Sequence, residues 1–577
     1  MRVDVAPLAR TMSRVEWVRI VFATGLLALT TVAITWPLFR HPASTVLDTE
    51  SLYGPASVLI QRDINLNIWT LAWDSHALVT DPLHLFHANA FYPARHTLAL
   101  FDHLLGIVPL FAPVYWATAN PVLAHQVALL LSFVLAGLGM TAYVLYWTED
   151  EMAALAAGFL YAFAPFRLWQ LGNLQVISVQ YLPLVALAID ASLDGRWGCR
   201  APLLLTGALV LSAFSSYYVG YPAFLVAGTY TTMGLLARGR AGLGRLVPIG
   251  TAIAVAALVT AAVSVPYVLL QRSGVLPDYE KSNFTSLAFL TMLRFGLRGV
   301  LRFYVVPSKE SIPVFLTYTA MTLGLTGVLA HRRHPRGALV MVGAVGIVLA
   351  LGPYLLLPGM RPIPLPYRLL AAVVPGFSAL RVPQRFGVLA ALALGSLSGL
   401  GLAAARRRLG TRGRVAAALP VLAIAAVLAE TRPGGLRGYP LPVGPNVPAA
   451  YRWLTEHGNA APLLELPLRR ANLYGESLSM YYSTCHWLPV VNGYTSYPPR
   501  SYVGVAEAAA GLPRPDALDA VLRQVPLRWI LLHRDALAAG TSPAWEATLR
   551  QALTPVADFG ETMLFEVPAD RRPGGVS

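Results

Sequence analysis

Residues 17–38 read WVRIVFATGLLALTTVAITWPL, an apolar run that contains a single charged residue, Arg19. A helix needs about 20 mostly apolar residues to cross the hydrocarbon core of a bilayer, so this run is long enough to span it. The core of a cleaved signal peptide has only about 7–15 apolar residues. Because arginines also precede the run, we expect a retained first membrane helix with its N-terminus in the cytoplasm.

The whole chain has the composition of a membrane protein with several spans. It has 577 residues, of which 56% are hydrophobic and 13% are charged, whereas soluble domains have about 25% charged residues. The formal net charge of +15 comes largely from arginines in short connectors between apolar runs, where the positive-inside rule places them. The sequence shows no basic helix and no basic patch interleaved with aromatic residues, so the charge does not indicate a nucleic-acid partner.

The apolar runs and their connectors predict about 11 membrane helices. With the N-terminus inside, the arginine-rich connectors all fall on the cytoplasmic side. The apolar segment 104–118 would reverse this pattern if it crossed, so we expect it to be interfacial or re-entrant. The candidate spans are 17–38, 122–146, 152–166, 176–192, 201–218, 221–236, 247–269, 312–330, 337–357, 386–405 and 415–431.

The predicted topology places three regions outside the membrane, at residues 39–121, 270–311 and 358–385. After residue 431 the chain becomes richer in proline, glycine and polar residues, and no further spanning run follows. The fold class that we expect is mainly α. A polytopic membrane helix bundle covers residues 1–431, with 39–121 as a first outer loop that carries interfacial helices. A C-terminal extracytoplasmic α/β domain covers residues 432–577.

Within the C-terminal region, the spacing of apolar residues predicts an α/β order of elements. We expect helices at 447–457, 501–511 and 515–524 and strands at 463–468 and 529–532. The two cysteines, Cys199 and Cys485, fall on opposite sides of the membrane in this topology, so we expect no disulfide.

The first outer loop contains the carboxylates that could carry chemistry. Asp63 lies in the sequence QRDINLNIWTLAWD at residues 61–74. A carboxylate within reach of an acceptor hydroxyl can take its proton as a general base. Aspartate is also a common N-cap, and Asp63 could instead cap a helix that starts near Ile64.

Asp102 and His103 form a second candidate pair just before the apolar segment 104–118. Asp102 could act as a second acid, bind a metal ion or cap a helix, and His103 would lie beside it. Asp81-Pro82 is a turn signal, and Asp74 is expected to face water. Half of the 12 histidines lie between His76 and His125, but their spacing matches no standard zinc site, so we expect solvated histidines and no metal ligands there.

Aromatic residues accompany these carboxylates. Trp69 and Trp73, with Phe91 and Tyr92 further on, fit the aromatic belt at a membrane interface, and tryptophans can also stack on sugar rings. In the C-terminal region, a polar and aromatic group includes His486. That group could bind an acceptor or seal the domain onto the membrane portion.

Several motifs together resemble the GT-C superfamily of polytopic membrane glycosyltransferases, in particular a bacterial branch of uncharacterised members. They are Asp63-x-x-x-Asn67-x-Trp69-x-x-x-Trp73, Asp81-Pro82, Asn89-x-Phe91-Tyr92-Pro93, Phe163-x-Pro165-Phe166-Arg167, Arg381-Val382-Pro383-x-Arg385-Phe386, Tyr482-Ser483-Thr484-Cys485-His486-Trp487 and Asn492-Gly493-Tyr494. The resemblance covers most of the chain. Members often carry a pair of acidic residues early in the first outer loop, whereas Arg62 precedes Asp63 here.

The resemblance implies a transferase of the bacterial inner membrane that moves a sugar from a polyprenyl-phosphate carrier to a glycan, lipid or protein of the cell envelope. It implies Asp63 as the base and Asp102 as a second catalytic candidate. The substrate-binding candidates are Arg167, Arg381 and Arg385 for the phosphate, and Trp69, Trp73, His103 and His486. No cofactor is expected with certainty, although a carboxylate site for Mg²⁺ or Mn²⁺ is compatible with the loop. A transporter or flippase of lipid-linked sugars, or a non-catalytic scaffold with the same fold, are the alternatives.

Overall fold

The computed structural model describes residues 14–53, 58–274, 317–330, 335–355, 363–380, 382–411, 413–432, 434–468 and 473–572. Contacts between residues divide the chain into two compact units. Unit 1 consists of Met1–Arg40, Val127–Ala262 and Glu280–Leu436, and unit 2 consists of His41–Gln126, Val263–Tyr279 and Arg437–Ser577. The first outer loop, which the sequence assigned to the membrane bundle, is therefore grouped by its contacts with the C-terminal residues.

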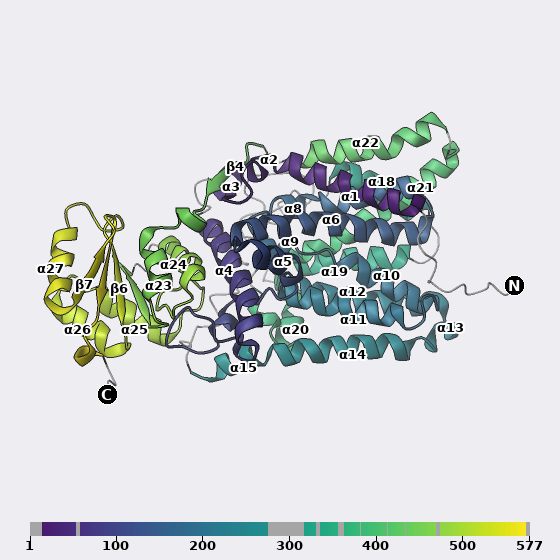
Figure 1. Ribbon diagram of the computed structural model, residues 1–577. Helices are drawn as coiled ribbons and strands as arrows, with labels where there is room; N and C mark the ends of the chain where they lie inside the picture. Colours follow the sequence, from purple (N-terminus) through teal and green to yellow (C-terminus); the bar gives the residue numbers. More distant parts are fainter. Residues whose placement is uncertain are drawn as a thin grey trace. The chain divides into compact units, whose positions relative to one another are not determined.

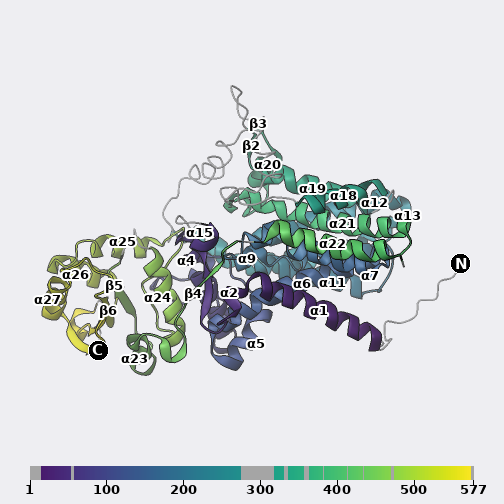
Figure 2. The same cartoon turned by 90° about the horizontal axis from the view of Figure 1, so that it is seen from above.

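Unit 1 is built from apolar helices that run alongside one another in both views (Figures 1 and 2). Every predicted span overlaps a helical stretch, although residues 312–316 and 356–357 lie outside the described residues. The main helices are α1 (Arg14–Ile34), α6 (Pro121–Thr148), α7 (Glu151–Ala162), α10 (Leu182–Leu193), α11 (Arg200–Ser215), α12 (Tyr217–Arg238), α14 (Leu246–Val263), α18 (Tyr318–Ala330), α19 (Arg336–Ala350), α21 (Val388–Leu409) and α22 (Arg414–Thr431). Shorter elements are α2 (Trp36–Phe39), α8 (Pro165–Leu168), α9 (Leu174–Ile177), α13 (Arg240–Leu243), α20 (Pro366–Val373), η4 (Phe377–Ala379), η5 (Pro383–Gly387) and the strand pair β2 (Tyr354–Leu355) and β3 (Ile363–Pro364).

Six helical stretches in the described chain are long and apolar enough to cross a membrane. They are Trp17–Ile34, Pro121–Thr148, Leu174–Leu193, Leu246–Arg272, Pro383–Leu409 and Arg414–Thr431. The helices α11, α18 and α19 are apolar but shorter. The protein is a multi-pass membrane protein, and the count of about 11 spans stays a prediction.

Close packing of α18 against α21 depends on glycine. A Cβ atom added to Gly327 would lie 2.0 Å from the carbonyl oxygen of Leu397, and one added to Gly401 would lie 2.2 Å from that of Leu323. Both distances are far below contact distance, so only a residue without a side chain fits at either position. Small residues let membrane helices approach closely, because dispersion contacts drive their association where apolar burial cannot.

The C-terminal part of unit 2 holds a four-stranded mixed sheet in the order β5-β6-β8-β7 (Figure 1). The strands β5 (Leu463–Leu466) and β6 (Trp529–His533) pair in parallel, and β8 (Thr562–Glu566) is antiparallel to both β6 and β7 (Thr554–Asp558). The helices α23 (Ala449–His457), α25 (Arg500–Ala509) and α26 (Pro515–Gln524) lie where the sequence predicted them. The predicted strand 463–468 ends at Leu466, because Pro467 has no N–H group for a strand ladder.

Other elements of unit 2 had not been predicted. They are α24 (Leu473–His486), α27 (Ser542–Ala552), the antiparallel pair β1 (Thr45–Asp48) and β4 (Arg437–Pro440), and the short elements α3 (Thr49–Tyr53), η2 (Pro82–His84), η3 (Thr97–Leu100), η6 (Gly444–Asn446) and η7 (Ala569–Arg571). The helix α15 (Val265–Arg272) overlaps the end of the predicted span 247–269. The first outer loop supplies α4 (Val58–Thr80) and α5 (Val108–Thr118). The 11 residues of α5 extend about 16 Å, short of the roughly 30 Å hydrocarbon core, as expected for an interfacial segment.

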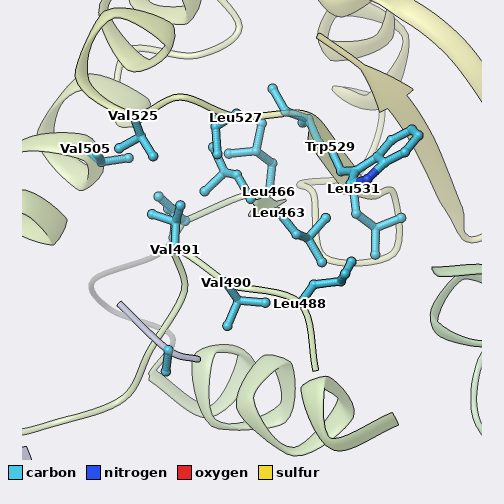
Figure 3. Packing of buried hydrophobic residues seen from close by; sticks show 14 of the residues in the cluster. Leu463, Leu466, Leu488, Val490, Val491, Val505, Val525, Leu527, Trp529 and Leu531 are labelled. Atoms are coloured by element: carbon cyan, nitrogen blue, oxygen red, sulfur yellow. The ribbon is translucent and has the colours of Figure 1, made fainter. Parts of the chain in front are cut away.

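The core of the sheet is closed by the segment before Asn492. Leu463 accepts a hydrogen bond from the Val491 N–H at 2.9 Å, and Val490 forms a parallel bridge with Leu463. In Figure 3, Val490 and Val491 lie beside Leu463 and Leu466 among other buried aliphatic side chains. The same apolar cluster contains residues of the first outer loop, including Phe91. The loop therefore contributes to the hydrophobic core that it shares with the α/β domain.

Candidate active site

The helix α4 presents one half-buried face. Asp63, Leu66, Trp73 and His76 are partly exposed, whereas every other described residue from Gln61 to Ala77 is buried. Residues three or four apart lie on the same side of a helix, so these four form a single stripe. Because α4 is already helical at Val58, Asp63 lies inside the helix. The interpretation of Asp63 as an N-cap is therefore wrong.

Asp63 meets a residue from the far end of the chain. The hydroxyl of Tyr494 donates a hydrogen bond to Oδ1 of Asp63 at 3.1 Å. The guanidinium carbon of Arg62 lies 5.9 Å from the centre of the Tyr494 ring, within cation–π range. Tyr494 therefore contacts both the Asp63 carboxylate and the Arg62 side chain, a connection that the sequence motifs alone did not reveal.

Polar atoms next to Asp63 lack partners among the described residues. Nε2 of Gln61, Nε of Arg62 and Oδ1 of Asn65 are all buried, and none of them has a hydrogen-bond partner there. The other end of the Asn65 amide donates to Oγ of Ser477 at 3.2 Å. A buried polar atom without a partner costs free energy, so these first turns of α4 contain unused hydrogen-bonding capacity.

Trp69 is a buried core residue. Its side chain is fully buried, and its indole N–H donates to Oδ1 of Asn89 at 3.1 Å. Nδ2 of Asn89 in turn donates to the carbonyl oxygen of Leu488 at 3.1 Å. Trp69 therefore fits neither the predicted substrate contact nor an interfacial belt, because no part of its ring is exposed.

The motif Asn89-x-Phe91-Tyr92 pairs with the segment before Tyr494. The Tyr92 N–H donates to the Val490 carbonyl at 2.9 Å, and the Val490 N–H donates to the Asn89 carbonyl at 2.7 Å. These bonds join the two motifs, which are about 400 residues apart, into one backbone ladder. Phe91 is fully buried, so it is a core residue and contacts neither solvent nor lipid.

Asp102 is half-buried. Two residues before it, the carbonyl of Leu100 accepts a hydrogen bond from Oγ1 of Thr495 at 3.3 Å. The structure therefore brings the Asp102 segment beside the segment that carries Tyr494. His103 is 3% exposed, and burial lowers its pKa to about 4. Its Nδ1 accepts the Leu105 N–H at 3.4 Å. A neutral, buried imidazole fits packing better than the predicted substrate contact.

A cluster of aromatic rings occupies the other end of the half-buried face of α4. The His76 ring stacks on Trp487 with 4.2 Å between centroids and 12° between planes, and Trp73 meets Trp487 edge-on at 5.9 Å. The Trp73 indole donates to the Leu85 carbonyl at 2.8 Å. Trp73 is partly exposed, so it remains a candidate for substrate contact.

Asp74 does not face water, as the sequence had suggested. Its side chain is fully buried, and neither carboxyl oxygen has a partner among the described residues. Burial raises the pKa of this carboxyl well above its ordinary value. Asp81 does lie in an exposed turn, where its carboxylate contacts His84 at 3.0 Å.

His486 lies beside a buried ionic network in the α/β domain. Its Nδ1 accepts the Leu488 N–H at 3.0 Å, and burial lowers its pKa to about 4. The network itself centres on Glu465, whose Oε2 accepts hydrogen bonds from Tyr451 at 2.7 Å and from Nε2 of His533 at 2.8 Å. The His486 ring stacks parallel to Tyr451 at 6.1 Å and is 9% exposed, so in this conformation it supports the domain and offers no open binding surface.

Arg167, in unit 1, does not fit the predicted role of holding a phosphate. Its guanidinium is 1% exposed and donates to the carbonyls of Ile177 at 3.1 Å and Ala162 at 3.0 Å, and to Oγ of Ser132 at 3.0 Å. It also lies 3.9 Å from the centre of the Phe133 ring. These guanidinium hydrogen bonds link the C-terminal ends of α7 and α9.

Arg385, also in unit 1, is a better candidate for an anion contact. It is half-buried, its guanidinium lies 4.3 Å from the centre of the Tyr218 ring, and its Nε has no partner among the described residues. The third predicted arginine, Arg381, lies outside the described residues.

In the part of the chain that the structure describes, no group of three or more His, Cys, Asp or Glu residues is arranged to hold a metal ion. This observation gives no support to a pre-formed Mg²⁺ or Mn²⁺ site built from protein side chains alone.

Comparisons with known proteins identify the fold. No family model and no curated protein sequence match the chain. Among solved structures, the arabinofuranosyltransferase AftD from mycobacteria matches with a TM-score of 0.58 and 17% sequence identity, over 99% of this chain and 41% of that chain. A mutant form of AftD gives a TM-score of 0.58 at 16% identity, over 98% and 42% of the two chains.

The chain therefore spans about two-fifths of the length of AftD (41%). A third structure, ArnT from Cupriavidus metallidurans, matches with a TM-score of 0.37 at 12% identity, over 96% of this chain and 99% of that chain, which is too low to bear on the fold. At these identities the likeness to AftD concerns the fold alone. The chain has a GT-C-like membrane fold, as its motifs implied.

Proposed function

We propose that the protein is a membrane glycosyltransferase that takes a sugar from a polyprenyl-phosphate carrier, with Asp63 as the general base. The observation that carries this proposal is the placement of Asp63. It is a half-buried carboxylate inside α4 that accepts a hydrogen bond from the Tyr494 hydroxyl at 3.1 Å. Together with a GT-C-like fold, this placement favours a substrate site over a helix cap.

In the proposed reaction, an acceptor hydroxyl oxygen attacks the anomeric carbon and gives its proton to the Asp63 carboxylate. The bond between the anomeric carbon and the phosphate oxygen breaks, and its electron pair leaves with the polyprenyl phosphate. Attack opposite the leaving group inverts the anomeric configuration. The departing phosphate needs positive charge nearby.

Arginines are the natural partners of that phosphate, since a guanidinium can bind it through two parallel hydrogen bonds. Arg62 lies on the same turn of α4 as Asp63 and has an Nε atom without a partner among the described residues. Arg385 has the same property in unit 1, and the motif that it shares with Arg381 keeps that residue a candidate. Asp102 is proposed as a second acidic group, because its segment is bonded to the one that carries Tyr494.

The acceptor is proposed to be a glycan, lipid or protein of the cell envelope. From the arginine-rich connectors we propose an orientation with the N-terminus in the cytoplasm and the C-terminal α/β domain outside a bacterial inner membrane. The aromatic cluster of Trp73, His76 and Trp487 would then lie on the outer side with Asp63.

The test is transfer from defined donors. Purified protein is incubated with polyprenyl-phosphoryl arabinofuranose, mannose and glucose and with a cell-envelope extract as acceptor, and released polyprenyl phosphate is measured. Arabinofuranose is included because AftD is an arabinofuranosyltransferase. We expect release with at least one donor for the wild type and none for Asp63→Asn. Equal release by both proteins would remove Asp63 from the mechanism, and movement of intact donor across vesicles without release would favour a flippase.

A further inference from the structure

We infer that Tyr494 is a positioning residue for the Asp63 carboxylate, and that the α/β domain fixes it in place through Asn492. This inference rests on the proposed function. Its starting point is the 3.1 Å hydrogen bond from the Tyr494 hydroxyl to Oδ1 of Asp63. Fixing one carboxylate oxygen fixes the plane of the group, and therefore the direction in which its second oxygen points.

Asn492 anchors the segment on one side. Its Oδ1 accepts the Glu465 N–H at 2.8 Å, and its Nδ2 donates to the Glu465 carbonyl at 3.0 Å and to Oε2 of Glu476 at 3.1 Å. Asn492 is 2% exposed. Its amide thus fastens the chain to both β5 and α24, and it does so two residues before the tyrosine.

Phe91 and the backbone around Tyr494 complete the clamp. A Cβ atom on Gly493 would lie 2.4 Å from the Phe91 ring, so the ring packs directly against the glycine. The Tyr494 N–H points to the sulfur of Met480 at 3.1 Å, and the Phe91 N–H donates to the Asn492 carbonyl at 3.3 Å. The backbone that carries the Tyr494 side chain is therefore held in place by contacts with both Phe91 and Met480.

The hydrogen bond from Tyr494 favours the ionised form of the Asp63 carboxylate. A hydroxyl that donates to the charged form of an acid stabilises that form. Arg62 lies over the Tyr494 ring from the same helix as Asp63. The other titratable groups on the adjoining segment are Asp102 and His103, and burial keeps His103 neutral. Without the tyrosine hydroxyl, Asp63 would lose one donor while these other groups stayed as they are.

Tyr494→Phe tests the inference directly, with Tyr481→Phe as the matched control. Tyr481 also loses a hydrogen bond in this change, because its hydroxyl donates to the Pro442 carbonyl at 2.7 Å. With the donor that the wild type uses, we expect Tyr494→Phe to lower kcat about tenfold, with little change in KM, since a hydrogen bond to a charged group is lost. The acid limb of its pH–rate profile should move to higher pH, whereas the profile of Tyr481→Phe should keep the wild-type shape.

A second variant tests the clamp without touching either polar group. Gly493→Ala drives a methyl group into the Phe91 ring and should lower kcat in the same way as Tyr494→Phe. Adding Phe91→Leu makes room for the methyl group and should restore part of the lost kcat. Thermal unfolding of each variant shows whether the fold has survived.

The outcomes separate the two proposals. If Asp63→Asn is inactive while Tyr494→Phe matches Tyr481→Phe in kcat and in pH profile, the positioning role is overturned and the glycosyltransferase proposal stands. If Asp63→Asn keeps full activity, Asp63 is not the general base, and the positioning role of Tyr494 is refuted with it. A folded Gly493→Ala with wild-type kcat would contradict the clamp.

Discussion

The Tyr494 hydroxyl lies 3.1 Å from Oδ1 of Asp63, although the two residues are 431 positions apart in the chain. This single contact joins the first outer loop to the C-terminal segment. It is supported by a ladder of backbone bonds between Asn89, Tyr92 and Val490 and by a buried apolar cluster to which both segments contribute. The carboxylate on which the proposed chemistry depends is therefore held by residues from both ends of the protein.

Replacement of Asp63 should abolish transfer without unfolding the protein. Asp63→Asn and Asp63→Ala are each expected to lower kcat by about 100- to 10,000-fold, the usual contribution of a general base. The side chain is half-buried, so the melting temperature in detergent should change little. Asp81→Asn is the control, since Asp81 lies in an exposed turn and contacts only His84 among the residues described around it.

Arg167 should prove to be a structural residue. Arg167→Leu leaves the carbonyls of Ile177 and Ala162 without their donor, at a cost of roughly 1–3 kcal/mol for each. We expect a large fall in thermal stability, and Arg167→Lys should not restore it, because a lysine cannot make the same planar set of bonds. The exposed Arg200→Leu is the control. If Arg167→Leu has normal stability but a raised KM for the donor, the result would instead support a substrate-binding role for Arg167.

The stability of the α/β domain should depend on pH through His533 and Glu465. Burial alone would lower the pKa of His533, but the hydrogen bond and charge of Glu465 raise it overall, and the bond from His533 in turn lowers the pKa of Glu465 against its burial. The raised histidine pKa adds stability that is present below about pH 6.5 and is lost as pH rises through the folded value. The lowered glutamate pKa adds stability that is present above about pH 4.5 and is lost as pH falls.

Thermal unfolding as a function of pH measures this effect. The wild type should be most stable between about pH 4.5 and 6.5 with respect to this pair. His533→Gln should flatten the decline in stability above that window. A steep alkaline decline that persists in His533→Gln would assign the pH dependence to other groups.

The close approach of α18 and α21 predicts a matched pair of glycine variants. Gly327→Ala places a methyl group 2.0 Å from the Leu397 carbonyl oxygen and should destabilise the bundle by about 1–3 kcal/mol through overpacking. Gly250→Ala in α14 meets no atom within 4 Å and should leave stability unchanged or slightly higher. Thermal denaturation in detergent, followed by size-exclusion chromatography, compares the two. Equal melting temperatures would argue against tight packing at Gly327.

The two cysteines report the orientation of the chain. Cys199 is exposed and is predicted to face the cytoplasm, so a membrane-impermeant maleimide should label it in intact cells only after permeabilisation. Cys485 should react slowly in either case, because burial raises the pKa of its thiol to about 11 and the thiolate is the reactive form. The variant Cys199→Ser identifies the labelled site. Labelling of Cys199 in intact cells would reverse the predicted topology.

Much of the fold could be predicted because its signals are local. Hydrophobic length located the apolar helices, and the spacing of apolar residues located α23, α25, α26, β5 and β6. The start of α4 at or before Val58 was missed, because its polar first turns resemble a loop. The helix α24 and the strands β7 and β8 were missed too. The pairing of β8 with β6 is a non-local contact, and strand preference depends on such cross-strand neighbours.

The candidate site shows the same division between local and distant information. The sequence by itself determined that this is a multi-pass membrane protein with an early loop aspartate, because hydrophobic length and residue type are properties of short stretches of chain. Only the tertiary structure decided which polar groups meet. It paired Asp63 with Tyr494 and buried Arg167 among carbonyls, since a hydrogen bond depends on distances of about 3 Å that packing alone creates.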